Sequence, residues 1–372
     1  MQRRHLLHLA AASLMPSAAL ASSTFAPRFL HVGTYAPLGQ GIYSFTIGRD
    51  GALTPIGLTP NANSPSWLVA HDGRVYAAEE SADHVAIYTP GAAGTLQLLH
   101  RAPSGGKGPA HLSVNAGRVW VAHYGDARFS ALPLQADGKL GAATSWRSCD
   151  ADCRPGPTKP VKAPPGSQAN SGHEAPHAHA IQVSADGRWI VGTDLGRDKL
   201  LVWPLADVAP KAVVHELALS PGSGPRHFVF HPQDASLVYV LQEESSTLST
   251  VALTAEGPKL LDEISVLPAG FAGTNYASDL LVAPGGQHLY ALGRLHDSIG
   301  VLSLEKPRAP RLLDHHWVHG NYPRSACVAG SHLYVCNQRS DQVSHFDLST
   351  PASPRFTGKQ TGVPGPAGAC WL

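Results

Sequence analysis

Apolar positions along this chain fall into pairs of short runs, and the pairs recur at a nearly constant spacing. The second run of each pair carries an apolar triplet. The triplets are Phe29-Leu30-His31, Val75-Tyr76-Ala77, Val119-Trp120-Val121, Trp189-Ile190-Val191, Val238-Tyr239-Val240, Leu289-Tyr290-Ala291 and Leu333-Tyr334-Val335. They lie about 44 to 51 residues apart, except for one interval of about 70 residues. Short strands repeated at this period are typical of a β-propeller, so the seven copies predict an all-β fold of seven blades.

A first apolar run precedes six of the triplets and follows a turn that contains proline in most copies. These first runs lie at residues 64–70, 108–114, 175–183, 224–232, 275–284 and 322–330. Hairpin signals such as Asp72-Gly73 and Gly285-Gly286 separate the two runs of a pair. The triplet at residue 29 has no such run before it, and residues 365–372 supply one at the other end of the chain. We therefore expect the carboxyl-terminal strand to complete the first blade and close the ring, whereas an open sandwich would not require equal spacing.

Composition supports an all-β chain that is rich in turns. The 372 residues include 37 Gly and 31 Pro, only 15% are charged, and no long stretch has helical periodicity. We expect residues 28–372 to form a single propeller domain, because each blade of a propeller packs against its neighbours. The formal net charge of +1 and the lack of Lys/Arg clusters argue against nucleic acid as a partner and favour a small molecule. We expect a monomer.

The first 21 residues have the features of a signal peptide. Arg3-Arg4 precede an apolar run from Leu6 to Leu20, and Ala19-Leu20-Ala21 fits a cleavage site. The two arginines resemble a twin-arginine signal, although any signal peptide can carry two arginines. The run is short for a membrane span. We expect export to the periplasm or the medium, with no membrane span after the signal is removed.

An exported chain can hold disulfides, and this chain has five cysteines. Cys149 and Cys153 share a Pro-rich segment, and a bridge between them would pin that segment. Cys327 and Cys336 lie on consecutive predicted strands and could face each other across the hairpin. Cys370 remains without a partner.

The two strands of each pair are antiparallel, so the start of the first strand and the end of the second lie at the same rim of the channel. Four residues beyond the middle of each triplet the chain has Thr34, Glu80, Tyr124, Asp194, Glu243, Arg294 and Gln338. At the start of the first strands it has Ser66-Trp67, Ala110-His111, Ala178-His179, Arg226-His227, Ser278-Asp279 and Arg324-Ser325. This rim gathers arginines, carboxylates and imidazoles, and we expect the functional site there.

Several motifs resemble the seven-bladed propeller lactonases, a family related to bacterial 6-phosphogluconolactonase and fungal carboxy-muconate lactonizing enzyme. The resemblance extends over residues 28–372 and is carried by GSGPRHFVFHP (222–232), YVLQEESS (239–246), HLYALGR (288–294), YPRS (322–325) and the run from 175 to 200. It implies that Arg226, Glu243, Arg294 and a histidine, either His179 or His177, occupy the active-site positions of the family. The signal peptide and a Pro-rich insertion at about 147–175 depart from the family pattern.

These residue types suit the hydrolysis of a sugar lactone or a related lactone. His179 or Glu243 could deprotonate a water molecule, and Arg226 and Arg294 could stabilise the oxyanion or bind a substrate carboxylate or phosphate. The alternative to a catalytic role is that Arg226 and Glu243 form a buried ion pair that only holds neighbouring blades together. We expect further substrate contacts from His177, Asp194, His227, Arg324 and Asn337.

Two other functions are compatible with the same rim. One is a propeller that binds a ligand or a protein without catalysis, and the other is a cycloisomerase that forms a lactone by proton transfer. Two groups of histidines raise the possibility of a metal site, namely His173, Glu174, His177 and His179, and His315, His316 and His319. Their spacing is a weak metal signal. We expect neither a metal nor a cofactor.

The insertion at about 147–175 joins the outer strand of one blade to the inner strand of the next. That connection lies on the same face as the start of the inner strand. Its five prolines, Pro155, Pro157, Pro160, Pro164 and Pro165, preclude a regular helix. We therefore expect a lid over the pocket, whereas a passive surface loop is the alternative.

Overall fold

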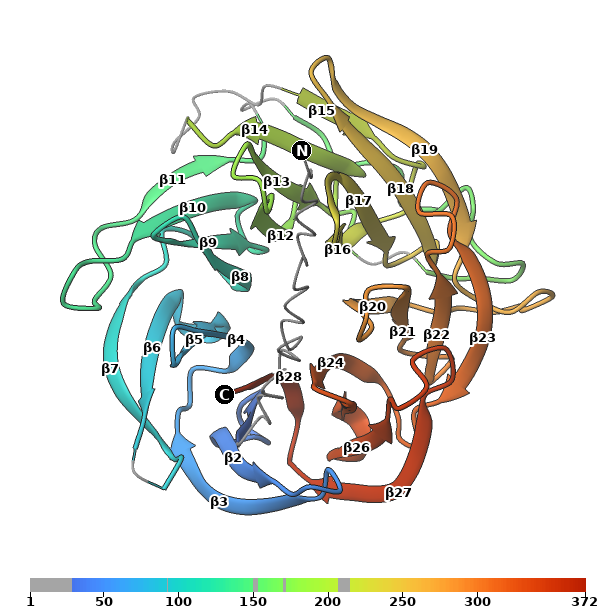
Figure 1. Cartoon of the computed structure of the whole chain (residues 1–372). Coiled ribbons are helices and arrows are strands. Elements are labelled where there is room, and N and C mark those ends of the chain that lie inside the picture. The colour runs from blue at the N-terminus through green and yellow to red at the C-terminus, as the bar shows by residue number, and fades with distance from the viewer. Residues whose placement is uncertain (1–28, 92, 150–152, 170–171, 207–214) are drawn as a thin grey trace, which may run out of the picture.

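The computed structural model describes residues 29–372 except residue 92 and the segments 150–152, 170–171 and 207–214. The predicted signal peptide lies outside the described residues. Within them, seven four-stranded antiparallel sheets surround a central channel as the blades of a propeller (Figure 1). The predicted fold class is therefore confirmed. No helix in the described part of the chain has the length and apolar character needed to cross a bilayer.

Each blade contains four strands, counted here from the channel outward, and blade 1 holds β28, β1, β2 and β3. The innermost strands are β28 (Pro366–Trp371), β4 (Pro65–His71), β8 (Pro109–Asn115), β12 (Ala178–Val183), β16 (Pro225–His231), β20 (Ala277–Val282) and β24 (Pro323–Ala329). The second strands are β1 (Phe29–Thr34), β5 (Arg74–Glu79), β9 (Arg118–His123), β13 (Trp189–Asp194), β17 (Asp234–Gln242), β21 (His288–Gly293) and β25 (His332–Asn337).

The two outer layers follow the same order from blade 1 to blade 7. The third strands are β2 (Gly41–Ile47), β6 (His84–Pro90), β10 (Arg128–Pro133), β14 (Lys199–Pro204), β18 (Thr247–Thr254), β22 (Ser298–Ser303) and β26 (Gln342–Asp347). The outermost strands are β3 (Leu53–Pro60), β7 (Leu96–Pro103), β11 (Thr144–Arg147), β15 (His215–Ala218), β19 (Gly257–Ser265), β23 (Arg311–Trp317) and β27 (Arg355–Gly362). Two short 3-10 helices, η1 (Glu80–Ala82) and η2 (Gln338–Ser340), follow β5 and β25 in the described chain.

The core is divided among the interfaces between blades. Seven clusters of buried apolar side chains occur in the described residues, and each contains residues from two neighbouring blades. The second strands supply large members of these clusters, such as Tyr76, Trp120, Tyr239 and Tyr290, none more than 1% exposed. Strands that are buried on both faces read as continuous apolar runs, which explains why the triplets stand out in the sequence.

The carboxyl-terminal strand closes the ring as predicted. β28 pairs with β1 in an antiparallel register that places Leu30 opposite Trp371 and Val32 opposite Ala369. Phe29 and Leu372 exchange two backbone hydrogen bonds of 3.0 Å each. Blade 1 is therefore built from both ends of the propeller domain.

A shift in register marks the start of each innermost strand. It falls at Pro65/Trp67, Pro109/His111, Ala178/Ala180, Pro225/Phe228, Ala277/Leu280 and Pro323/Ser325, and next to Thr34 in blade 1. Such bulges turn a side chain out of its normal alternation and are common beside active sites. In this protein the bulges occur at the residues that were predicted to lie at the rim.

The pairing also corrects the predicted rim in two blades. In three other blades, the last residue of the second strand pairs with the first residue of the innermost strand. These last residues are Glu79, Gln242 and Asn337, and in each case the next residue along the chain lies at the rim. Thr34 and Asp194 hold the same facing position in blades 1 and 4. The rim residues of these blades are therefore Tyr35 and Leu195. Side chains alternate along a strand, so a slip of one residue reverses the face they occupy.

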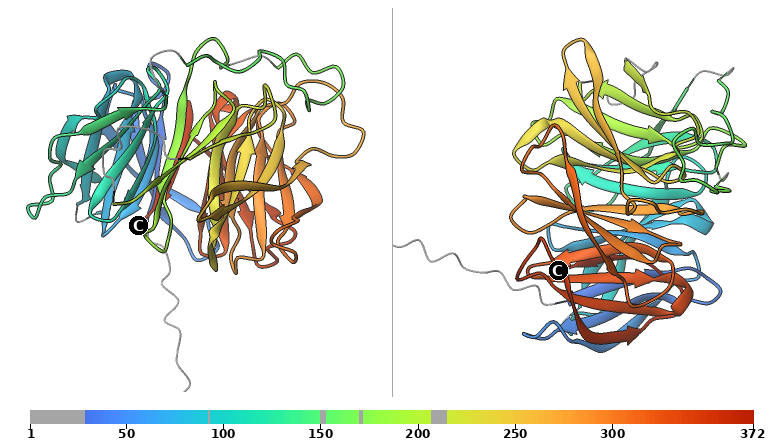
Figure 2. Two further views of the ribbon diagram at one scale, coloured as in Figure 1. Left: turned by 90° about the horizontal axis from the view of Figure 1, so that it is seen from above. Right: turned by 90° about the vertical axis from the view of Figure 1, so that its right-hand side faces the viewer.

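The insertion crosses the face of the ring where the innermost strands begin (Figure 2). Backbone hydrogen bonds join Gly156 to Gly196 of blade 4 (2.7 Å), Val161 to Pro221 before blade 5 (3.0 Å), and Gly273 before blade 6 to Pro165 (2.8 Å). Lys162 adds an ion pair of 2.9 Å with Glu263. The insertion therefore lies above three blades on the predicted side.

Two of the five cysteines form a disulfide, Cys149–Cys153, at the start of the insertion. The expectation for Cys327 and Cys336 is wrong, because both are free and buried, as is Cys370. Cys327 lies opposite Tyr334, and Cys336 lies opposite Ser325. The two cysteines are thus offset along the hairpin and do not form a directly facing pair.

Candidate active site

Two arginines and a glutamate form an ion-pair cluster at the rim. Arg226 lies on β16, Glu243 follows β17 and Arg294 follows β21. Nε of Arg226 is 2.9 Å from Oε2 of Glu243, and Nη2 of Arg294 is 2.6 Å from Oε1. We call these residues the arginine–glutamate cluster. It joins blades 5 and 6 and brings together three of the four residues that were predicted to be catalytic.

The charges in this cluster are fixed by their mutual contacts. Burial alone would raise the pKa of Glu243, but Arg294 and Arg226 outweigh this effect and lower the pKa, so the carboxylate is ionised at neutral pH. Burial and the charge of Arg294 lower the pKa of Arg226 to about 10, which still leaves it protonated. Two guanidinium groups against one carboxylate give a net positive charge. Such a site stabilises negative charge that develops on a bound oxygen.

Arg324 extends the positive rim to blade 7. Its Nη2 donates a hydrogen bond of 2.6 Å to the hydroxyl group of Tyr35, and its guanidinium carbon lies 4.8 Å from the centre of the Tyr35 ring. The Tyr35 hydroxyl donates to Glu80 at 2.9 Å, and Ser66 donates to the same carboxylate oxygen at 2.6 Å. Arg324 is also one of the charges that lower the pKa of Glu243, so both face the same rim. Tyr35 was absent from the predicted rim because of the register slip in blade 1.

Tyr124, His177 and His179 stand beside the cluster on blades 3 and 4. The His177 ring stacks on Tyr124 with centres 4.0 Å apart. Its Nδ1 is 2.6 Å from the carbonyl oxygen of Tyr124, and its Nε2 is 2.9 Å from a carboxylate oxygen of Glu174. Both ring nitrogens of His177 are therefore engaged.

His179 differs from His177 in having an unpartnered ring nitrogen. Its side chain is buried, and Nδ1 has no hydrogen-bond partner among the described residues. Burial, followed by the charge of Arg226, holds the pKa of His179 well below the usual histidine value, so the ring is neutral. Of the two candidate histidines, His179 is thus the one with a ring nitrogen that makes no hydrogen bond to the described residues.

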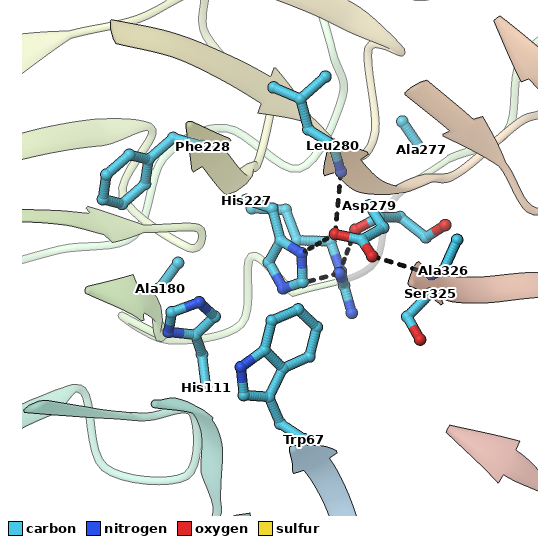
Figure 3. A network of polar contacts seen from close by, with 12 residues as sticks. Trp67, His111, Ala180, His227, Phe228, Ala277, Asp279, Leu280, Ser325 and Ala326 are labelled. Carbon is cyan, nitrogen blue, oxygen red and sulfur yellow. Dashed lines mark hydrogen bonds and ion pairs between the residues drawn. The ribbon is translucent and has the colours of Figure 1, made fainter. Parts of the chain in front are cut away.

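His227 and Asp279 lie one layer deeper in the channel. Nδ1 of His227 is 2.8 Å from Oδ1 of Asp279 (Figure 3). The rings of Trp67, His111 and His179 surround His227, with ring centres 4.8, 5.5 and 5.2 Å away. These side chains come from blades 2 to 6 and form a ring across the channel. We call them the histidine layer.

A cavity of about 1140 Å³ lies on the other side of the histidine layer. Trp67 and Asp279 form part of its wall, together with apolar residues such as Leu281, Val328 and Trp371. It contains none of the arginines of the rim. The guanidinium groups of the rim therefore lie at the end of the channel where the innermost strands begin.

Asp194 and Asn337 are not brought to the site, although both were expected to contact substrate. Asp194 accepts hydrogen bonds from Ser148 Oγ (2.5 Å) and from the backbone N–H of His177 (2.9 Å). Asn337 donates to Ser344 on β26 at 2.9 Å. Both occupy the position before the rim residue, where the side chain points the other way.

His173, in the insertion, is held between two carboxylates. Its Nε2 is 3.0 Å from Asp198 of blade 4, and its Nδ1 is 3.1 Å from Glu244 of blade 5. Burial would lower the pKa of His173, but the contacts with Asp198 and Glu244 raise it to about 10. Asp198 also accepts hydrogen bonds from the N–H groups of Gly222 (2.7 Å) and Gly224 (2.9 Å), two residues with positive φ in the loop before Arg226.

Within the described residues, no group of three His, Cys, Asp or Glu side chains is arranged to hold a metal ion.

The arrangement agrees with the result of a comparison with known protein families. The model of the family "Lactonase, 7-bladed beta-propeller" matches residues 29–371. The chain belongs to this lactonase family.

Two curated relatives of this lactonase are named 6-phosphogluconolactonase. The protein from Bacillus subtilis is 28% identical over 307 residues, which cover 79% of this chain and 83% of the relative. The protein from Erwinia tasmaniensis is 25% identical over 280 residues, covering 73% and 76%.

Solved structures share the fold of this lactonase. The periplasmic gluconolactonase of Pseudomonas aeruginosa has a TM-score of 0.78 at 24% identity, covering 93% of this chain and 99% of the other. A protein from Lactobacillus plantarum has a TM-score of 0.81 at 22% identity, with coverage of 93% and 99%.

Proposed function

We propose that this lactonase hydrolyses a sugar lactone, with the arginine–glutamate cluster and His179 as its catalytic residues. The observation that carries the proposal is a neutral imidazole, with an unpartnered Nδ1, in the histidine layer directly below two buried arginines of the rim. Ester hydrolysis by water needs a proton acceptor for the water and a positive site for the carbonyl oxygen. The rim and the histidine layer below it together offer both.

In the proposed reaction, His179 accepts a proton from a water molecule while the water oxygen bonds to the lactone carbonyl carbon. The carbonyl oxygen becomes an oxyanion that Arg226 and Arg294 stabilise. Collapse of this intermediate breaks the bond between the carbonyl carbon and the ring oxygen. The ring oxygen takes the proton from His179, and the product is a hydroxy acid. One water molecule is consumed, and no nucleophilic side chain is required.

Glu243 is better suited to holding the arginines than to acting as the base. Each of its oxygens contacts one arginine, and its lowered pKa makes it a weaker proton acceptor than an isolated carboxylate. Its proposed role is to orient both guanidinium groups toward the substrate. The same contacts limit the net positive charge of the pocket.

The relatives named 6-phosphogluconolactonase make a phosphorylated gluconolactone the first substrate to test. Arg324 supports an anionic substituent on the substrate, because it adds a third guanidinium group to the rim.

We further propose that the chain is exported and functions in the periplasm or outside the cell, on the basis of residues 1–21. Amino-terminal sequencing of the protein recovered from the periplasmic fraction tests this: a mature chain starting near Ser22 supports export, and an intact Met1 in the cytoplasm contradicts it.

A pH-stat assay tests the activity directly. The native protein is mixed with gluconolactone, its 6-phosphate and a simple lactone that lacks hydroxyl groups, and acid release is recorded against the spontaneous rate. Hydrolysis releases acid and places one oxygen from 18O-labelled water in the product. Loss of lactone without 18O would indicate a cycloisomerase, and an unchanged spontaneous rate with all three lactones would favour a binding propeller.

A further inference from the structure

His227 and Asp279 connect to the arginine–glutamate cluster through Arg226. Nη1 of Arg226 lies 3.1 Å from Nε2 of His227 and also contacts the carbonyl oxygen of Ser278. On its other side, Nε of Arg226 faces Glu243. The guanidinium group is thus held between a carboxylate at the rim and an imidazole below it. Both Arg226 and His227 are less than 5% exposed, so water does not compete for these contacts.

Asp279 accepts hydrogen bonds as an ionised carboxylate at neutral pH, because burial raises its pKa only to about 6. Besides His227, it contacts the backbone N–H groups of Leu280 (2.9 Å) and Ala326 (3.1 Å), which both donate to it. Ala326 lies on the innermost strand of blade 7, so Asp279 is fixed from two blades. A carboxylate that already accepts two N–H groups requires a third donor at its remaining contact. Nδ1 of His227 must therefore carry the proton.

This assignment determines what Nε2 of His227 can do. A neutral imidazole with the proton on Nδ1 has a lone pair on Nε2, which accepts a hydrogen bond. A guanidinium group has only N–H donors, so Arg226 needs an acceptor at this position. In the opposite tautomer, an N–H of His227 would face an N–H of Arg226. The tautomer selected by Asp279 is thus the one that holds Arg226 in place.

We propose that Asp279 is a positioning residue: it selects the tautomer of His227 that accepts a hydrogen bond from Arg226, and so orients Arg226 toward the lactone carbonyl oxygen. The proposal deepens the proposed function and rests on it, because Arg226 is the group that stabilises the oxyanion. Asp279 lies one layer below the rim and acts on the orientation of Arg226 through His227. Removing it should therefore lower kcat more than it changes KM.

The tautomer can be measured without any substrate. Protein labelled with 15N-histidine is studied by NMR, and the signals of His227 are identified by their loss in His227→Gln. The expected spectrum shows a protonated Nδ1 and an unprotonated Nε2 in the native protein, and a larger share of the opposite tautomer in Asp279→Asn. A native His227 with its proton on Nε2, or with both nitrogens protonated, overturns the proposal. Since no turnover is needed, this result stands even where the lactonase assay is negative.

Kinetic coupling between the two positions tests the consequence. With a lactone that the native protein hydrolyses, Asp279→Asn should lower kcat by roughly tenfold or more. His227→Gln places an amide oxygen near the former Nε2, which accepts from Arg226 in the absence of tautomer control. In that background, Asp279→Asn should change kcat by less than roughly threefold. His227→Asn reaches only the Nδ1 position, so it serves as the matched variant that leaves Arg226 without an acceptor and loses activity.

An equal loss of kcat from Asp279→Asn in the native and His227→Gln backgrounds would show that Asp279 does not act through His227. Full activity of a folded Asp279→Asn would also overturn the proposal. If this variant does not fold, Asp279→Glu, which keeps the charge and the acceptor oxygens, replaces it and should retain the native tautomer. The native spectrum then decides alone whether His227 presents a lone pair to Arg226.

Discussion

His173 of the insertion lies 3.1 Å from the carboxylate of Glu244. Glu244 directly follows Glu243, the carboxylate of the arginine–glutamate cluster, in the sequence. The same imidazole contacts Asp198, so one positive charge from the insertion compensates two buried carboxylates of the blades. The insertion is therefore electrostatically part of the blade 4–blade 5 interface.

Removal of His173 should make the protein less stable in a manner that depends on pH. The pKa of His173 is about 10 in the folded protein, against an ordinary value of 6.5. Its stabilising contribution is thus complete below pH 6.5, decreases above it and is lost once the pH passes 10. We expect the difference in melting temperature between the native protein and His173→Gln to shrink from pH 6 to pH 10.5. Other groups that titrate in this range cancel in the difference, and a constant difference would contradict the charged state of His173.

Removal of the negative charge from the arginine–glutamate cluster should impair catalysis. Glu243→Gln keeps the shape of the side chain but leaves Arg226 and Arg294 without their common partner, so we expect kcat/KM to fall about a hundredfold, or about 2.7 kcal/mol in barrier. The melting temperature should fall as well, because two buried cations lose a counter-charge. Arg355→Ala, which breaks the exposed ion pair with Asp347 on blade 7, is the control and should leave the kinetics unchanged. Native kinetics in Glu243→Gln would remove the cluster from the mechanism.

The path of the insertion across blades 4 to 6 predicts an effect on substrate access. Replacing residues 154–168 with a Gly-Ser linker of the same length removes five prolines and the Lys162–Glu263 ion pair, but keeps His173 and the disulfide. We expect altered KM values that differ between small and large lactones, with little change in melting temperature. Identical kinetics for all lactones would mean that the segment is a passive surface loop.

The three free cysteines should be unreactive in the folded protein. Burial raises the pKa of Cys336 to about 12 and that of Cys327 and Cys370 above the ordinary value, so little thiolate is present at pH 8. A thiol reagent should detect no fast-reacting group in the native state and three thiols after denaturation without reductant. Finding one thiol after denaturation would indicate a second disulfide.

The repeat period and the register of the strands predicted the fold and most of the rim from residues alone. Glu243 and Arg294 were found because Tyr239 and Tyr290, the middle residues of their triplets, each lie three residues before the end of the strand. The triplets around Leu30 and Ile190 begin one residue earlier, and this slip put Thr34 and Asp194 at the rim in place of Tyr35 and Leu195. Strands that are buried on both faces lack the polar alternation that would reveal such a slip.

Pairings between blades could not be predicted in the same way. His227 and Asp279 are 52 residues apart and lie on different sheets, so their contact depends on how two blades pack. The same holds for His173, whose partners depend on the path of an irregular loop. A sequence pattern indicates which residues reach the rim, but the choice between His177 and His179 depends on which ring nitrogens find partners.

The closure of blade 1 by β28 has a consequence for the order of folding. Six blades consist of strands that are consecutive in sequence, and each can form as soon as its own segment is available. Blade 1 pairs the two ends of the domain, and a contact of such high sequence separation forms slowly. The hydrogen bond from Arg324 to Tyr35 joins residues 289 positions apart across this junction. The arginine-rich rim is thus completed only when the ring closes, so we expect enzyme activity to appear only after blade 1 has formed.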